Sequence, residues 1–228
     1  MTVILDLLDW FSKTVDMNAI LDRWRGEGSN YHPEGAAEGA CYLDNFEVAL
    51  GTSEDQRLYD KAVQRLFAYR YYPDSVLTAV ADFARDGRLP LPGDRIVQRI
   101  KVIPYILDAI TMNIVKSVWR EPDSSGFTII TSERHYEVGE WTVAIDRHPN
   151  GEVALVVRID SYPSNQLRFL ARWFARALQL RAHRLARRDF AQAVLEQVSS
   201  TTAGGGTSYK DIGVPRHRSH VRARKARP

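Results

Sequence analysis

Five segments in the middle of the chain alternate between apolar and polar residues, and turn-forming residues separate each segment from the next. Alternation with a period of two is typical of strands that bury one face. Pro104, Pro122 and Gly151 lie in three of the intervening turns. We therefore expect strands at residues 94–103, 106–119, 126–134, 140–147 and 152–160. The short connections predict that consecutive strands pair as an antiparallel meander.

A long helix is expected to follow the meander, over residues 163–198. Apolar residues recur there at the spacing of one helix face: Leu167, Leu170, Phe174, Leu178, Leu185, Phe190 and Val194. The other faces carry seven arginines, which are Arg168, Arg172, Arg176, Arg181, Arg184, Arg187 and Arg188. The predicted fold class is therefore α+β, with a curved antiparallel β-sheet meander packed around a long C-terminal helix, a shape that encloses a cavity.

The region before the meander predicts smaller elements. Apolar residues at helical spacing between residues 2 and 25 indicate an N-terminal amphipathic helix that packs on the body of the protein. Its four aspartates would repel anionic lipid, which disfavours the alternative of a helix lying in a membrane surface. A strand is expected at 45–50, with helices at 54–68 and 75–85. The chain accordingly divides into an N-terminal helix (1–29), an α+β domain (30–198) and a disordered basic tail (199–228).

Charge is unevenly distributed along the chain. The formal net charge is +3, but residues 201–228 carry seven Lys/Arg and one Asp, a charge of +6 that leaves −3 on the rest. Residues 216–227 are expected to make weak, salt-dependent contact with polyanions or acidic membranes. The alternative is a charged end that only keeps the chain soluble. The aromatic residues around Arg70 are interpreted as core and rim, so no specific nucleic acid is predicted as a partner.

Cysteine usage and hydropathy favour a cytoplasmic location. Cys41 is the single cysteine, so an internal disulfide is excluded and a reducing compartment is the natural setting. The N-terminus lacks the basic region of a secretory signal. No stretch approaches the roughly 18–20 apolar residues that a spanning helix needs.

Catalytic and metal-binding signatures are not found in the sequence. The histidines and the cysteine show no metal-ligand spacing, and neither a Gly-x-Ser-x-Gly elbow nor a phosphate-binding loop is present. His135 and Glu140 flank a predicted turn and could form an acid/base pair, although an ordinary hydrogen bond in the turn is the simpler interpretation. We expect no cofactor, no metal and no catalytic residue.

The order of short motifs resembles the domain-of-unknown-function family nineteen-ninety, whose bacterial and plant members share this layout over roughly residues 30–197. The matching motifs are Asn30-Tyr31, Glu34-Gly35-Ala36, Leu50-Gly51-Thr52, Gly93-Asp94, Gly126-Phe127, His135, Gly139-Glu140, Ser161-Tyr162-Pro163 and Leu178-Gln179. The resemblance implies a helix-grip-like fold of the kind that binds lipids and other apolar ligands, with no established enzymatic activity. A channel-forming plant envelope member makes a membrane-associated role the alternative.

These observations together predict a binding module for an apolar small molecule or lipid. The expected lining residues lie on the predicted strands and on the long helix: Phe127, Ile129, Trp141, Val143, Phe174 and Leu178. Mostly apolar pockets use a few polar groups to orient a ligand. Arg70, His135 and Glu140 are the candidates for these groups. The alternative is a membrane-surface or pore-associated protein that uses its cationic helix and basic tail.

Overall fold

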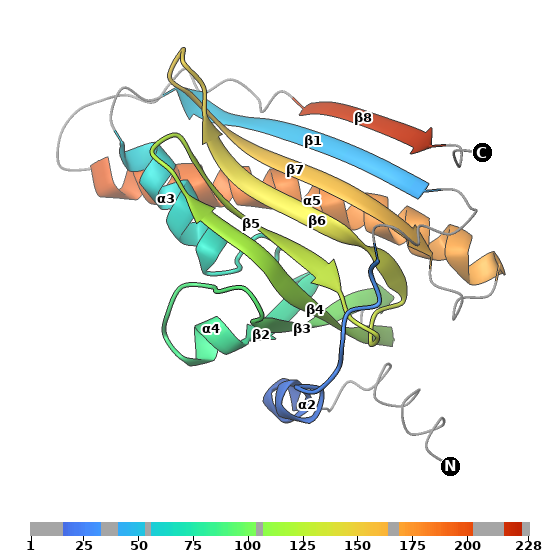
Figure 1. The fold of residues 1–228 in the computed structure, drawn as a ribbon. Coiled ribbons are helices and arrows are strands. Elements are labelled where there is room, and N and C mark those ends of the chain that lie inside the picture. Colours follow the sequence, from blue (N-terminus) through green and yellow to red (C-terminus); the bar gives the residue numbers. More distant parts are fainter. Residues whose placement is uncertain are drawn as a thin grey trace.

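The computed structural model describes residues 16–32, 41–52, 56–103, 107–163, 169–202 and 217–224. Eight antiparallel strands form one sheet in the order β2-β3-β4-β5-β6-β7-β1-β8 (Figure 1). The strands are β1 (Cys41–Thr52), β2 (Leu77–Ala81), β3 (Arg95–Ile103), β4 (Leu107–Arg120), β5 (Ser124–Thr131), β6 (Glu137–Arg147), β7 (Glu152–Pro163) and β8 (His217–Arg224). The described helices are α2 (Met17–Arg23), α3 (Arg57–Phe67), α4 (Asp82–Arg85) and α5 (Phe169–Thr202).

The predicted α+β fold is confirmed. All five expected strands of the meander are present as β3 to β7, and the long helix α5 runs along one face of the curved sheet (Figure 1). We call the face that carries α3 and α5 the inner face. The first strand, β1, pairs with the last strand of the meander, β7. The first strand of the chain therefore lies beside the end of the meander.

One predicted element is wrong. Residues 75–85 do not form a helix, because Leu77–Ala81 is strand β2 and only Asp82–Arg85 is helical. β2 pairs with β3 from Leu77↔Ile100 to Ala81↔Ile96. Apolar residues in this segment fit both periodicities, and pairing with β3 satisfies the backbone groups of a short segment that contains β-branched residues.

Two apolar clusters lie on opposite faces of the sheet. On the inner face, side chains of the strands pack against α3 and the C-terminal half of α5, including Leu66 and Phe190. On the outer face, Ile20 and Leu21 of α2 and the next residue after the helix, Trp24, pack against β3 and β4. The N-terminal helix is therefore confirmed as a packing element over Met17–Arg23, while residues 1–15 lie outside the described residues.

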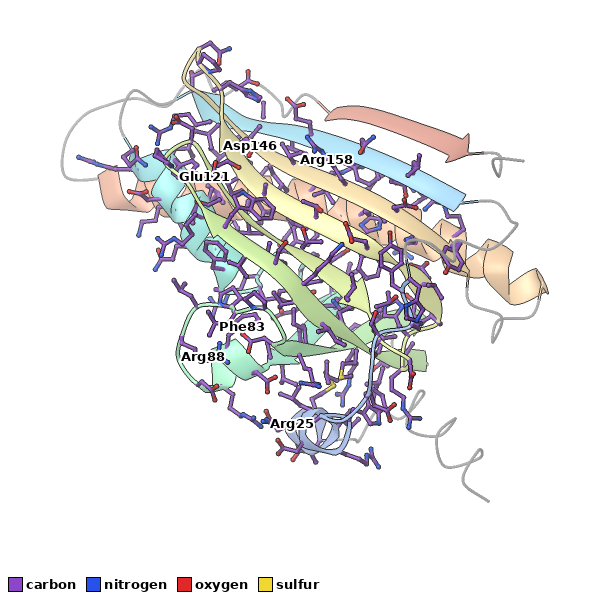
Figure 2. All side chains as sticks on the ribbon, in the orientation of Figure 1. Arg25, Phe83, Arg88, Glu121, Asp146 and Arg158 are labelled. Atoms are coloured by element: carbon purple, nitrogen blue, oxygen red, sulfur yellow. The ribbon has the colours of Figure 1, made fainter. Side chains whose placement is uncertain are left out.

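Ion pairs hold α2 and the turn after α4 onto this end of the sheet. Arg25 donates to Asp82 at 3.1 Å, and the backbone N–H of Arg95 donates to the second oxygen of Asp82 at 2.9 Å. Arg88 forms a two-pronged pair with Asp94, at 2.7 and 2.6 Å. Figure 2 shows Arg25 just beyond α2 and Arg88 just beyond α4, both at the surface of the molecule.

Part of the C-terminal region is also in the sheet, although disorder was expected for residues 199–228. Residues 199–202 continue α5, and His217–Arg224 pairs with β1 from Cys41↔Arg224 to Val48↔His217. Without β8, one side of β1 would be an unpaired edge. Main-chain pairing does not require apolar periodicity, which is why the sequence pattern gave no sign of this strand. The division of the chain into three domains stays a prediction.

Gly139 allows β6 and β7 to approach closely. A Cβ atom at this position would lie 2.5 Å from the carbonyl oxygen of Asp160 and 2.6 Å from the Cβ of Ser161. Gly139 and Ser161 are register partners. A side chain at position 139 would therefore push the two strands apart.

We predict that Gly139→Ala lowers the free energy of unfolding by about 2–3 kcal/mol, because overpacking forces the backbone to shift. Gly26→Ala is the matched control, since a Cβ at Gly26 meets nothing within 4 Å. Urea denaturation of both variants measures the difference. Equal stability of the two variants would show that β6 and β7 separate without cost.

Candidate functional site

The helix face that meets the sheet changes from apolar to polar along α5. Residues 176, 179, 183 and 187 follow one another at intervals of three and four, so they share one face. We call this set, Arg176, Gln179, His183 and Arg187, the polar stripe. Gln179, His183 and Arg187 are 8%, 3% and 5% exposed, and the side chain of Arg176 is 13% exposed. Four apolar residues continue the same side of the helix into the core: Phe190, Ala191, Val194 and Val198.

The position of Arg187 corrects the predicted helix faces. Arg187 was placed on an outward face and Leu185 on the buried face, but Arg187 is buried and Leu185 is 37% exposed. Five residues separate Leu185 from Phe190, which is about 140° around a helix, so both cannot face the sheet. Phe190 is fully buried. The requirement to bury Phe190 therefore turns Arg187 inward.

A buried ion pair joins the first strand to the polar stripe. Both Nη atoms of Arg176 donate to the two carboxylate oxygens of Asp44, each at 2.6 Å. Asp44 is fully buried on β1, and 132 residues separate the partners. A two-pronged pair fixes orientation as well as distance. The register of α5 on the sheet is therefore tied to Asp44.

A hydrogen-bond network extends from this pair to β6. Arg176 donates to the amide oxygen of Gln179 at 2.5 Å, and the Gln179 amide donates to Glu137 at 3.0 Å. Burial raises the pKa of Glu137 to about 8, and the nearby charge of Asp44 adds to the rise while Arg176 opposes it. The Glu137 carboxyl is therefore protonated at neutral pH. The site therefore holds an uncharged Glu137 carboxyl beside the Asp44–Arg176 ion pair, whose net charge is zero.

His135 lies next to this network as a neutral imidazole. It is 1% exposed, and burial lowers its pKa to about 3. The backbone N–H of Glu137 donates to Nδ1 of His135 at 3.0 Å. Nδ1 also lies 3.2 Å from the carbonyl oxygen of Glu137, so these two contacts are compatible with either neutral tautomer. Nε2 of His135 is buried and has no hydrogen-bond partner.

Trp141 and Ser161 add two further polar atoms to the same region. The rings of Trp141 and His135 meet edge to face, with centroids 5.3 Å apart. Trp141 pairs with Ile159 on β7, two residues from Ser161. Nε1 of Trp141 and Oγ of Ser161 are buried and have no hydrogen-bond partner. Three unpartnered polar atoms thus come from neighbouring positions of β6, β7 and the turn before β6.

A second group surrounds the ring of Phe46, farther along α5. The guanidinium of Arg187 lies 4.0 Å from the centroid of this ring, and the His183 ring centroid lies 5.6 Å from it. Tyr72 Oη and His183 Nδ1 are hydrogen-bonded at 3.1 Å. Burial, and next the charges of Arg187 and Arg176, lower the pKa of His183 to about 3. Arg187 Nε, His183 Nε2 and Tyr71 Oη are buried without a partner.

The structure brings together only part of the predicted site. Phe127, Ile129, Trp141 and Val143 are all buried on the inner face, where the rings of Phe67 and Tyr69 pack against Phe127. His135 contacts Trp141. The side chains of Phe174 and Leu178 lie outside the described residues.

The other two predicted polar groups lie elsewhere. Arg70 is exposed. Glu140 forms an ion pair with Lys116 and is adjacent on β6 to Trp141, whose side chain is on the inner face, so Glu140 points to the outer face. The structure therefore does not place His135 and Glu140 together as an acid/base pair.

One group of metal-ligating side chains lies where β1 meets the β6–β7 turn. Ligand atoms of Glu47, His148 and Glu152 all lie within 4.8 Å of one another, and all three residues are partly exposed. Sequence spacing did not reveal this group, because β1 contributes one residue and the β6–β7 turn region contributes the other two. Such exposed groups are common without an ion, and no function is assigned to this one.

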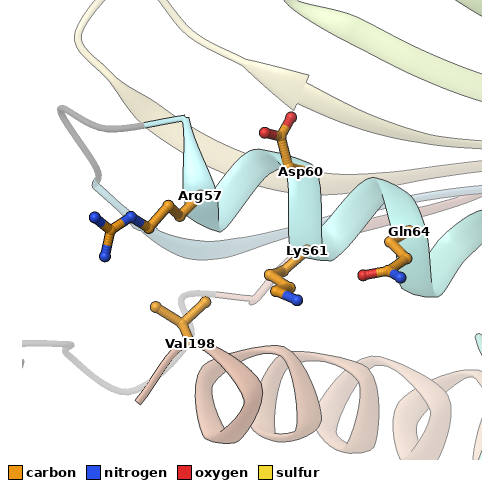
Figure 3. Close-up of a pocket in the computed structure, with 5 residues that line it drawn as sticks. All are labelled: Arg57, Asp60, Lys61, Gln64 and Val198. Carbon is orange, nitrogen blue, oxygen red and sulfur yellow. The ribbon is translucent and has the colours of Figure 1, made fainter. Parts of the chain in front are cut away.

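A hollow of about 220 Å³ lies between α3 and the end of α5 (Figure 3). Arg57, Asp60, Lys61 and Gln64 line it from α3, and Val198 lines it from α5. Three of the four polar residues are exposed. The hollow is therefore a surface feature, separate from the buried polar stripe.

Breaking the pair between Asp44 and Arg176 should leave a buried charge without a partner. We predict that Asp44→Asn lowers the free energy of unfolding by about 3–5 kcal/mol. Asp22→Asn, which breaks the largely exposed pair with Arg85, should cost less than about 1 kcal/mol. Chemical denaturation measures both values. Similar losses in the two variants would contradict a structural role for the buried pair.

The raised pKa of Glu137 predicts a specific pH dependence. The unfolded chain loses this proton near pH 4.5 and the folded protein near pH 8, so stability should fall as pH rises between these values. The slope from this group is about 1.4 kcal/mol per pH unit at most. Glu137→Gln should remove this contribution, so the variant gains stability relative to the parent protein from pH 5 to pH 8.

Denaturation midpoints of the two proteins across this range test the prediction. Glu140→Gln, on the other face of the same strand, is the matched control. Parallel pH profiles for the parent protein and Glu137→Gln would contradict a protonated carboxyl in the interior.

None of the described helices is both long and apolar enough to cross a membrane.

Comparison with known proteins identifies the family of this chain. No curated protein matches the chain. The family model described as Domain of unknown function (DUF1990) matches residues 30–189, which include β1 to β7 and more than half of α5. The protein therefore belongs to the DUF1990 family.

Proposed function

We propose that this protein binds a small organic molecule between the inner face of the sheet and the polar stripe of α5. The observation that carries the proposal is a set of buried polar atoms without hydrogen-bond partners: Tyr71 Oη, His135 Nε2, Trp141 Nε1, Ser161 Oγ, His183 Nε2 and Arg187 Nε. Buried polar groups in folded proteins are nearly always partnered, and each missing partner costs about 1–3 kcal/mol. A bound molecule would supply these partners.

The surroundings of these atoms favour a ligand that is partly apolar. Ile129 lies opposite Trp141 on the neighbouring strand, and Val143 and Phe127 form the next pair along. Phe46 and Phe190 border the group around Arg187. Ligand sites are typically lined by apolar side chains with a few fixed polar groups. An apolar small molecule or lipid with a polar end fits this pattern.

Ordered water could also partner buried polar atoms, and it would leave no organic molecule behind. Native mass spectrometry of freshly purified protein, followed by organic extraction, separates the two cases. A stoichiometric organic passenger is the expected result. Its absence, together with no stabilisation by organic extracts of the producing cells, would overturn the proposal.

We predict that Trp141→Phe reduces the fraction of protein that carries the passenger. Losing one hydrogen bond of about 1 kcal/mol should weaken binding roughly fivefold. Trp119→Phe is the matched control, because Nε1 of Trp119 already donates to Ser124 at 3.0 Å. Native mass spectrometry compares the occupied fraction in both variants. Equal occupancy of the two variants would show that Trp141 does not donate a hydrogen bond to the passenger.

The alternative of a membrane-surface role rests on the cationic side of α5. Arg181, Arg184 and Arg188 are exposed on this helix. Exposed arginines can attract anionic lipid in a salt-dependent manner. Flotation with anionic liposomes tests this alternative, and failure to float with the intact basic tail would count against it.

A further inference from the structure

We propose that the polar end of the ligand is an anion, and that Arg187 supplies its counter-charge. This inference rests on the proposed function and assigns the ligand to the class of carboxylates and similar oxyanions. Three observations carry it: the burial of Arg187, the missing counter-charge, and the hydrogen-bond donors that surround it.

Arg187 is a buried cation without an ion-pair partner. It is 5% exposed, and among the described residues no Asp or Glu oxygen lies within ion-pair distance of its guanidinium. Arginines are almost never this buried unless they are paired, because desolvating a lone charge is costly. The face of Phe46 contacts the guanidinium at 4.0 Å. This contact attracts the cation but does not neutralise it.

The contrast with Arg176 strengthens the assignment. Arg176 lies on the same stripe and is also largely buried, but Asp44 neutralises it through two hydrogen bonds of 2.6 Å. The protein thus pairs one buried arginine of the stripe internally and leaves the other without a carboxylate. An anionic ligand would complete the second pair as Asp44 completes the first.

The groups next to Arg187 can donate hydrogen bonds to an acceptor atom of a ligand. His183 lies one helical turn away and packs on the same Phe46 ring. When Tyr72 donates to Nδ1 of His183 across their 3.1 Å contact, Nε2 carries the hydrogen. Tyr71 stands beside Tyr72, with ring centroids 4.6 Å apart. Nε of Arg187, Nε2 of His183 and Oη of Tyr71 can therefore all donate, and none has a partner.

Three simple probes separate this inference from the proposed function: acetate, hexanoate and 1-hexanol. Each is titrated at constant ionic strength into the ¹⁵N-labelled full-length protein, and binding is followed by shifts in the protein NMR spectrum. Hexanoate should bind at least tenfold more tightly than 1-hexanol, because it alone carries the charge. Arg187→Met should weaken hexanoate at least tenfold and leave 1-hexanol unchanged.

Two further variants complete the design. Arg184→Met removes an exposed cation from the same helix and should leave hexanoate binding unchanged. Tyr71→Phe removes one donor and keeps the ring, so it tests the site even if Arg187→Met does not fold. It should weaken hexanoate severalfold and leave 1-hexanol unchanged.

Each outcome decides something. Equal binding of hexanoate and 1-hexanol, or hexanoate binding that is unaffected in Arg187→Met, would overturn the anion assignment and leave the proposed function standing. Arg187-dependent binding of acetate without any gain for hexanoate would support the anion site and contradict an organic ligand. No binding of any probe would overturn both.

Discussion

The packing of α5 on the inner face of the sheet is the constraint on which the rest of this structure depends. The helix must bury Phe190, Val194 and Val198 in the core, and this fixes its rotation about its own axis. The same rotation directs the polar stripe inward along the middle of the helix. The buried pair between Asp44 and Arg176 then fixes this part of the helix against β1. A single helix therefore builds both an apolar core and a polar interior.

The polar interior is electrostatically unusual. Glu137 is neutral because burial raises its pKa to about 8, and His135 and His183 are neutral because burial lowers their pKa values to about 3. Asp44 and Arg176 cancel each other. Arg187 remains as a buried charge that no carboxylate of the described residues pairs. A protein that only needed stability would be served better by apolar residues at these positions. The cost of this arrangement is the physical reason to assign the region a ligand.

The sequence was sufficient to predict the meander and the long helix, because alternation and helical spacing are clear patterns over long segments. It was insufficient for β2, where a short apolar segment fits a helix and a strand equally well. It did not predict β8, because backbone pairing along an edge leaves no periodic signal. The site depends on contacts that are distant in the chain: 132 residues separate Asp44 from Arg176, and 111 separate Tyr72 from His183. One helix face carries Arg176, Gln179, His183 and Arg187, as their spacing shows. The prediction instead placed a neighbouring face with more apolar residues against the sheet.

A high-resolution crystal structure of the protein, purified without any step that strips ligands, tests the central claim most directly. The account predicts continuous electron density of an organic molecule between the sheet and α5, with acceptor atoms within hydrogen-bond distance of Trp141 Nε1 and Arg187 Nε. Separate water molecules at these atoms, or side chains that fill the space and pair with them, would contradict it.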